Sequence, residues 1–287
     1  MEIKKPTALV TGCSEGGIGF GLVRELARRG VHVFASARSL SKMAALEKTP
    51  GITLVTLDVT SESSIEAAVA LISATTGGSL TYLVNNAGTQ IIRPFLDTSL
   101  AEVRKMFDVN VFGVAAGTQA FAPLLIKAGG TVVNLASITA YMCPPYMGGY
   151  SASKAACEVL SEVMRHELKP LGVKVLTVIT GAVKTNIFVN APDRGSQGQL
   201  PGGSHYLAAA AEVRARATGT EVEARLGSVE DFARELVEAM VRGKSGLVKI
   251  GNMSAIIPFL SSNAPAALFD YLAERDTGLD KVLKPVA

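Results

Sequence analysis

The sequence predicts an α/β fold in which helices cover both faces of one doubly wound parallel sheet. Short apolar runs recur along the chain, and each is followed by a longer segment whose apolar residues have helical spacing. This alternation is typical of strand–helix–strand units, which form parallel sheets. We expect a single domain over residues 1–287, because one hydrophobic core can still serve a chain of this length.

The first unit displays the pattern clearly. Residues 7–11 are strand-like, a glycine-rich turn follows, and Ile18, Leu22 and Leu26 then lie at helical spacing until Gly30. Five further strands are predicted, at 31–36, 52–57, 82–85, 130–136 and 173–180.

Two long helices are predicted between the later strands. One covers 100–127 and is expected to bend near Gly113 and Pro123, and the other covers 150–168 and ends before Pro170. After Thr185 the helical and strand periodicity ends. A mobile loop at 190–204, helices at 206–225 and 228–242, and an apolar C-terminal section are expected there.

Composition narrows the function classes. The net charge of +3 is small and the basic residues are scattered, so no nucleic acid is expected as a partner. Three cysteines are too few for a disulfide framework, which favours a reducing compartment. A strand-like run close to Met1 leaves no room for a signal peptide, and the histidines lack metal-ligand spacing. We expect a cytoplasmic protein without a metal site.

A glycine-rich segment, TGCSEGGIG at 11–19, joins the first strand to the first helix. Backbone N–H groups at such a helix start can bind the pyrophosphate of a dinucleotide, and glycine permits the close approach. A tight turn that needs positive φ angles is the alternative interpretation. The position between a strand and an amphipathic helix favours a nucleotide and a Rossmann-like sheet. The candidate contacts are Gly12, Ser14, Gly17, Ile18 and Gly19.

The residues after the second predicted strand indicate which dinucleotide binds. Enzymes that use NAD usually place an acidic residue there, which binds the ribose 2′-hydroxyl. This chain has Ala37, Arg38 and Ser39 instead. Because a guanidinium pairs with a 2′-phosphate, the sequence predicts NADPH/NADP+ as the cofactor. A solvated surface ion pair is the alternative for Arg38.

Tyr150 and Lys154 lie one helical turn apart on the same face of a predicted helix. Ser137 follows the fifth strand and is expected at the same edge of the sheet. A nearby ammonium favours the phenolate of a tyrosine, which suits acid–base catalysis. We expect Tyr150 to protonate a carbonyl oxygen as hydride arrives from the nicotinamide, while Ser137 binds that oxygen. Their structural alternatives are a surface tyrosine, a solvated lysine and a strand-end cap.

These motifs resemble those of the short-chain dehydrogenase/reductases over roughly the first 190 residues. The resemblance implies that Asp58 in LDVT lies on the adenine side of the cofactor. It also implies that NNAG at 85–88 stabilises the central strands, so that Asn86, Ala87 and Gly88 lie beside the cofactor. Asn110 in DVNVFG would be the fourth catalytic residue, holding a helix bend and a water that links Lys154 to solvent.

The resemblance continues in TGAVKTN at 180–186, which implies that Val183 and Thr185 contact the nicotinamide carboxamide. Tyr150 and Lys154 would also contact the cofactor. Two features depart from the family pattern: the glycine turn has one residue more than the common TGxxxGxG spacing, and Thr180 stands where proline is usual. Within the family, the turn, ASARS at 35–39 and GLDKVL at 278–283 resemble fungal acyl-dihydroxyacetone-phosphate reductase-like proteins.

The expected activity is NADPH-dependent reduction of a bulky lipophilic ketone, of a lipid or secondary-metabolite type, to an alcohol. Residues 142–146 and 188–206 are expected to form two largely apolar or small-residue walls of the substrate pocket. Three alternatives stay open: a non-catalytic NADPH-binding regulatory protein, a nucleotide-sugar epimerase or dehydratase, and a family member repurposed for isomerisation or cyclisation.

Assembly and location follow from apolar faces. Helices 100–127 and 150–168 have faces broad enough to pair with a second copy, and the family resemblance implies the same, so a homodimer or homotetramer is expected. The apolar section at 253–272 is expected to pack on its own domain or a partner subunit. Peripheral membrane contact through this section, at a lipid droplet or the endoplasmic reticulum, is the alternative.

Overall fold

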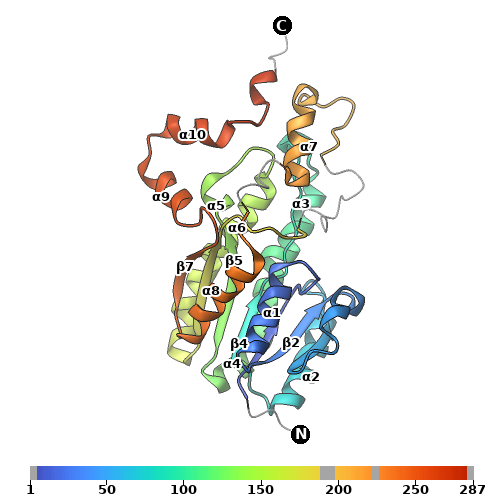
Figure 1. Cartoon of the computed structure of the whole chain (residues 1–287), viewed down its shortest axis with the longest axis vertical. Coiled ribbons are helices and arrows are strands. Elements are labelled where there is room, and N and C mark those ends of the chain that lie inside the picture. Colours follow the sequence, from blue (N-terminus) through green and yellow to red (C-terminus); the bar gives the residue numbers. More distant parts are fainter. Residues whose placement is uncertain (1–4, 188–197, 221–225, 283–287) are drawn as a thin grey trace.

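One parallel sheet organises the chain (Figure 1). The computed structural model describes residues 5–187, 198–220 and 226–282. Its strands follow the order β3-β2-β1-β4-β5-β6-β7, and every neighbouring pair is parallel. The strands are β1 (Thr7–Val10), β2 (His32–Ala37), β3 (Ile52–Thr56), β4 (Tyr82–Asn85), β5 (Thr131–Ser137), β6 (Lys174–Thr180) and β7 (Gly246–Ile250).

Helices cover both faces of this sheet because the strands are apolar on both sides. In β1, Ala8 and Val10 join the core cluster on the side of α1 (Ile18–Arg28) and α8 (Val229–Val241). Leu9 points the other way and joins the cluster on the side of α2 (Glu62–Thr76) and α4 (Gly113–Ala128). The doubly wound fold predicted from the sequence is therefore confirmed.

The remaining elements include α3 (Leu100–Phe107), a π-helical segment (Asp108–Phe112), α5 (Thr139–Met142), α6 (Gly148–Leu168), α7 (Ala210–Thr218), α9 (Ile256–Asn263) and α10 (Ala266–Glu274). The 3₁₀ segments are Leu40–Leu46, Phe95–Asp97, Lys169–Leu171, Leu207–Ala209 and Leu279–Lys281. Helices α7, α9 and α10 lie at the end of the molecule opposite the N-terminus, with α7 on one side and α9 and α10 on the other (Figure 1).

Three elements differ from the sequence prediction. Strand β7 was missed because it is a short edge strand with exposed alternate residues, so it lacks the apolar run of the buried strands. The helix predicted at 206–225 is shorter, since Gly219 at φ +77° ends α7, and 221–225 lie outside the described residues. The helix predicted at 100–127 contains the π-helical turn. The mobile loop predicted at 190–204 is described only from residue 198.

The helical stretch Leu100–Ala128 is long and apolar enough to cross a membrane by length and composition alone. In the fold, 44% of its most apolar window is buried. Phe121, Leu124 and Leu125 of α4 pack in the core cluster beneath the sheet. The apolar character of this stretch is therefore used at least partly for packing within the domain.

After β3, at one edge of the sheet, the chain returns to the middle and forms β4 beside β1. The strand order therefore reverses between β1 and β4. In doubly wound sheets the ligand crevice lies at this point, beyond the carboxyl ends of the strands. A buried polar network fixes this region: Asn85 Nδ2 donates to Asn134 Oδ1 (2.8 Å), and Asn134 Nδ2 donates to Ser161 Oγ (2.9 Å). It joins β4 and β5 to α6, the helix that carries Tyr150.

Candidate active site

The glycine-rich turn opens the crevice at the end of β1. Gly12 has φ +72°, and a Cβ added there would lie 2.8 Å from Ala87 Cα. Gly19 is equally constrained, because an added Cβ would lie 2.5 Å from Asn86 Nδ2. Helix α1 starts at Ile18 after Gly17, which has no side chain to cap it. The turn thus presents glycine backbone and a helix N-terminus to the crevice.

The lengthened turn contacts the segment after β6 through Gly16 and Glu15. Gly16 has φ +74°, and Asn186, in the segment after β6, lies directly over it: an added Cβ would be 2.3 Å from Asn186 Nδ2. The Asn186 backbone N–H donates to Gly16 O (3.2 Å) and its side chain donates to Glu15 O (3.0 Å). The longer turn therefore binds the segment that leaves β6.

The NNAG motif joins the ends of β1 and β4. Asn86 Nδ2 donates to Thr11 O (2.7 Å) and to Gly12 O (3.0 Å). In return, Thr11 Oγ1 accepts from the backbone N–H groups of Asn86 and Ala87, each at 3.0 Å. This reciprocal set holds the crevice walls in register.

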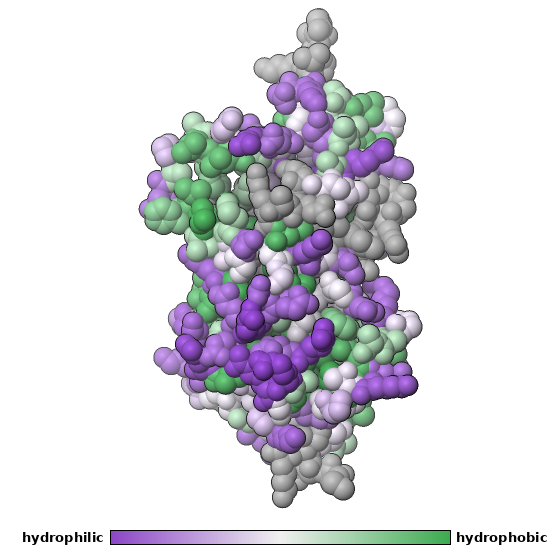
Figure 2. Space-filling model, viewed as in Figure 1, coloured by the Kyte–Doolittle hydropathy of each residue, from purple (hydrophilic) through white to green (hydrophobic). Residues whose placement is uncertain are grey.

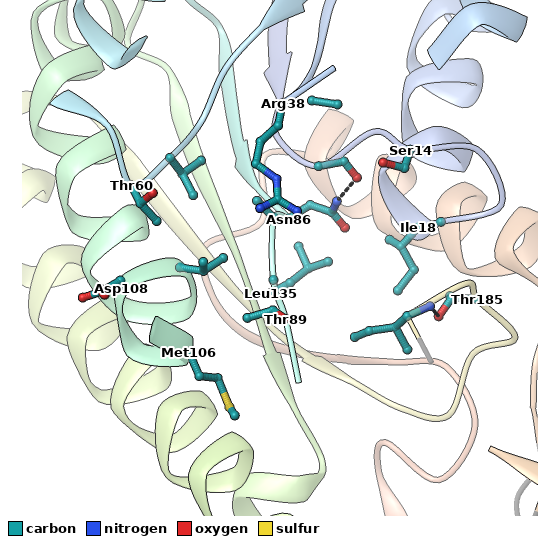
Figure 3. Close-up of a pocket in the computed structure, with 18 of the residues that line it drawn as sticks. Ser14, Ile18, Arg38, Thr60, Asn86, Thr89, Met106, Asp108, Leu135 and Thr185 are labelled. Carbon is teal, nitrogen blue, oxygen red and sulfur yellow. Dashed lines mark hydrogen bonds between the residues drawn. The ribbon is translucent and has the colours of Figure 1, made fainter. Parts of the chain in front are cut away.

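A cavity of about 750 Å³ lies along these walls (Figure 3). Arg38 points into it from the end of β2, opposite Thr185 from the segment after β6. Of the sequence-predicted cofactor residues, the cavity is lined by Gly12, Ser14, Gly17, Ile18, Arg38, Asp58, Asn86, Ala87, Gly88, Tyr150, Lys154 and Thr185. Gly19 and Val183 are not among its lining residues; Val183 is buried in the core beside Gly251.

The cavity is also lined by residues that the sequence did not indicate as cofactor contacts, including Lys42, Thr180 and Asn186. Lys42 lies four residues after Arg38, in the 3₁₀ segment Leu40–Leu46, and a second cation so close in sequence is the signal that could have found it. Thr180 ends β6 in register with Ser137. Its Oγ1 is buried and has no hydrogen-bond partner among the described residues.

Tyr150 and Lys154 share the buried face of α6. Lys154 Nζ lies 5.8 Å from the centroid of the Tyr150 ring and donates to Leu135 O (2.8 Å). Both side chains line the cavity. An ammonium and a phenol are therefore neighbours at the edge of the crevice.

Ser137 is the last residue of β5 and is buried. It does not itself line the cavity, although Leu135 and Ala136 just before it do. Ser137 Oγ accepts from Thr139 N (3.2 Å) and from Thr139 Oγ1 (3.0 Å). The hydroxyl thus stands at the carboxyl edge of the sheet, one residue beyond the cavity wall.

Asn110 lies in the π-helical turn and is 1% exposed. Its Oδ1 accepts from Thr89 N, and its Nδ2 donates to Thr89 O and to Ser153 Oγ, all at 2.9 Å. Asn110 is not a lining residue, but an added Cβ at Gly88 would lie 3.4 Å from Asn110 Oδ1 and 3.6 Å from Lys154 Nζ. Gly88 therefore lies between the amide and the ammonium.

The segment 142–146 does not line this cavity. Tyr146 has φ +71° and its hydroxyl donates to Thr277 O (2.9 Å), which fixes the segment to the C-terminal part. Burial raises the pKa of Tyr146 to about 12. Tyr141 donates to the Glu158 carboxylate, and burial together with that carboxylate raises the pKa of Tyr141. These two tyrosines are structural anchors rather than acid–base groups.

The three cysteines differ in exposure. Cys13 is fully buried in the glycine turn, and burial raises the pKa of its thiol to about 12. Burial also raises the pKa of Cys157 on α6. Cys143 is exposed at the end of α5, in the left-handed region at φ 46°.

Comparison with known proteins identifies the family. The family model described as short chain dehydrogenase matches residues 6–194. A short-chain dehydrogenase from Penicillium ochrochloron is 42% identical over 277 residues, covering 96% of this chain and 100% of that relative. The NADPH-dependent 1-acyldihydroxyacetone phosphate reductase of Schizosaccharomyces pombe is 39% identical over 206 residues, covering 72% of this chain and 69% of that relative.

Two solved structures extend the likeness to three dimensions. A short-chain dehydrogenase from Streptomyces avermitilis has a TM-score of 0.76 at 28% identity and covers 95% of this chain and 98% of its own. One from Burkholderia cenocepacia in complex with NADP has a TM-score of 0.72 at 28% identity, covering 95% and 99%. The chain therefore belongs to the short-chain dehydrogenase family of oxidoreductases, which bind nicotinamide cofactors.

Proposed function

We propose that this protein is an NADPH-dependent reductase that converts the carbonyl group of a bulky lipophilic ketone to an alcohol. The observation that carries the proposal is the pair formed by Tyr150 and Lys154 at the edge of the cavity, with Lys154 Nζ 5.8 Å from the Tyr150 ring. A phenol beside an ammonium, next to a dinucleotide-sized crevice, is suited to proton transfer coupled to hydride transfer.

The cavity residues fit a nicotinamide dinucleotide. Gly12 and Gly17 line the cavity without side chains, so a pyrophosphate can approach their backbone. Gly12, Ser14, Gly17 and Ile18 of the turn would hold the pyrophosphate, Asp58 the adenine side, and Thr185 the carboxamide. When bound, the cofactor supplies the hydride.

The choice of NADPH rests on charge at the end of β2. Arg38 and Lys42 both line the cavity there, and the segment 37–39 carries no carboxylate. Two cations would pair with a 2′-phosphate, which an acidic residue would repel. The S. pombe relative is named as NADPH-dependent, and the Burkholderia structure holds NADP. Arg38→Glu should lower kcat/KM for NADPH at least tenfold while leaving that for NADH within threefold; equal losses with both cofactors would contradict this choice.

The chain's own residues supply the proton and the binding of oxygen. The Ser137 hydroxyl donates to the carbonyl oxygen of the substrate and stabilises the charge that grows there. Tyr150 transfers its hydroxyl proton to the same oxygen as the carbonyl carbon gains the hydride, which gives a neutral alcohol. The ammonium of Lys154 stabilises the resulting phenolate until solvent returns a proton. Asn110 supports Thr89 and Ser153 around this centre.

The substrate class rests on apolar lining residues and on one relative. Ile91, Met106, Leu135 and Ile187 contribute to the cavity wall. The S. pombe relative is named for a 1-acyldihydroxyacetone phosphate, an acylated ketone. Burial of the apolar part of such a ketone in the cavity would stabilise the complex.

One screen tests cofactor, substrate class and mechanism together. Lipophilic ketones and charged sugars are each mixed with NADPH or NADH, and cofactor oxidation is followed by absorbance. We expect turnover with lipophilic ketones and NADPH, a loss of at least 100-fold in Tyr150→Phe, and no loss in Tyr271→Phe, a control at an exposed tyrosine of α10. Equal rates with sugars would refute the substrate class. Tight NADPH binding without turnover of any carbonyl would favour a regulatory protein.

Self-association is proposed through α4 and α6 and the turn between α3 and α4. Phe112, Val159 and Val163 are large apolar side chains exposed by 60%, 66% and 47% on these elements. Burying them in a symmetric contact with a second copy would remove apolar surface from water. We expect a homodimer or homotetramer by light scattering after gel filtration, and a shift to monomer in Val159→Glu. A monomeric wild-type protein would overturn this.

We propose that the protein is cytoplasmic and contacts a membrane peripherally through the end of the molecule that carries α9 and α10. Apolar side chains gather over α9 and α10 (Figure 2), among them Ile256, Phe259 and Tyr271 with exposures of 51%, 61% and 61%. Such a surface can enter the headgroup region of a bilayer. Flotation with neutral vesicles should carry the wild type but not Phe259→Asp; flotation of neither would remove membrane contact from the proposal.

A further inference from the structure

We infer that Thr139 is a positioning residue that fixes the Ser137 hydroxyl as a hydrogen-bond donor to the substrate. This inference rests on the proposed carbonyl reduction and concerns a residue that the family motifs do not include. Its basis is the pair of contacts within one turn, Thr139 N to Ser137 Oγ at 3.2 Å and Thr139 Oγ1 to Ser137 Oγ at 3.0 Å.

A serine hydroxyl has one proton and two lone pairs. Both contacts from Thr139 are donated to Ser137 Oγ, so both lone pairs are in use. Among the described residues, Ser137 Oγ donates to no acceptor. The proton of the Ser137 hydroxyl is therefore left to donate to another molecule. Rotation about the Cβ–Oγ bond that turned this proton away would break the hydrogen bonds from Thr139.

The surrounding backbone makes this arrangement rigid. Ser137 ends β5 in register with Thr180 of β6. Ile138, which lies between Ser137 and Thr139, is bound to β6 because its N–H donates to Thr180 O (3.1 Å). Thr139 then begins α5, where Tyr141 N and Met142 N both donate to Ile138 O (3.1 and 3.0 Å). The end of β5 and the start of α5 thus fix Ser137 and Thr139. The conformational entropy of ordering the hydroxyl is therefore lost on folding rather than during the reaction.

The orientation of the Ser137 hydroxyl should account for part of its effect on kcat. A single donor to a developing oxyanion contributes about 10²–10³-fold in kcat. Loss of one orienting hydrogen bond should forfeit a part of this, about 3–10-fold. Ser137 keeps its second contact, from the Thr139 backbone N–H, in any side-chain variant at 139.

The test is a double-mutant cycle on the full chain with the ketone found in the screen. Thr139→Val keeps the shape of the side chain but removes its hydroxyl, and Thr139→Ser restores a hydroxyl. Ser137→Ala and the double variant Ser137→Ala/Thr139→Val complete the cycle. Thr75→Val on α2 is the matched control, because among the described residues Thr75 Oγ1 donates to Leu71 O alone, in its own helix.

We expect Thr139→Val to lower kcat about 3–10-fold, with the Kd for NADPH, measured by its fluorescence, unchanged within twofold. Thr139→Ser should recover wild-type kcat within twofold. In the Ser137→Ala background Thr139→Val should have less than a twofold effect. An unchanged kcat in Thr139→Val, or an equal drop in the Ser137→Ala background, would overturn the inference while leaving the proposed function intact. A wild type that reduces no carbonyl would overturn both.

Discussion

Replacing Asn110 with alanine should reduce the free energy of unfolding by about 3 kcal/mol. The Asn110 side chain makes three hydrogen bonds, two with the backbone of Thr89 and one with Ser153 Oγ, all at 2.9 Å. At about 1 kcal/mol of net stabilisation for each bond, the sum is about 3 kcal/mol. Ser153 keeps its bond to Tyr150 O, so Thr89 bears most of the loss.

Urea denaturation followed by far-ultraviolet circular dichroism measures this change, since the chain has no tryptophan to report by fluorescence. The midpoint should fall while the slope stays the same, because the unfolded chain exposes nearly the same surface. Asn263→Ala is the control: within the described part of the chain, the side chain of this exposed α9 residue makes one hydrogen bond, to Phe259 O, and its loss should cost less than about 0.5 kcal/mol. A loss below about 1 kcal/mol in Asn110→Ala would refute the reasoning.

Three further predictions use other parts of the fold. Gly16→Ala should weaken NADPH binding about tenfold, since φ +74° and Asn186 Nδ2 at 2.3 Å both oppose a Cβ; an unchanged Kd in a fluorescence titration would contradict this. Hydrogen bonds led by the one from Arg28 lower the pKa of Glu25 from 4.5 to about 2, so its carboxylate stabilises the fold above pH 4.5 and ceases to do so as the pH falls toward 2. Glu25→Gln should flatten the pH dependence of unfolding in that window, and parallel curves would argue otherwise. Thr180→Val should raise the free energy of unfolding by about 1 kcal/mol, because it removes a buried unpartnered hydroxyl; calorimetry that finds a loss would indicate a bonded hydroxyl.

The strands and the crevice could be predicted from the sequence because their signals are local. Buried parallel strands are continuous apolar runs, so β1 to β6 were recognised, whereas β7 exposes alternate residues and was not. The glycine turn lies next to its helix in sequence, and Tyr150 and Lys154 lie one turn apart. Short-range spacing was enough to bring those residues to one cavity.

Other features depend on contacts distant in sequence. Nothing in TGCSEGGIG indicates that Gly16 meets Asn186, since 170 positions separate them (186 − 16). Val183 was expected at the cofactor, yet it is buried against the loop after β7, a strand that the sequence pattern did not predict. The π-helical turn at Asn110 depends likewise on its bonds to Thr89 and Ser153. Such positions follow from packing rather than from periodicity.

The unequal exposure of the three thiols gives this enzyme a built-in chemical handle. Maleimides react with thiolates, and Cys13 and Cys157 are buried with raised pKa values, so the native chain should take up one fluorophore, at Cys143. That position ends the short helix that begins at Thr139. The chain would then carry a dye at one defined position, with no engineered cysteine and no change to the reacting groups.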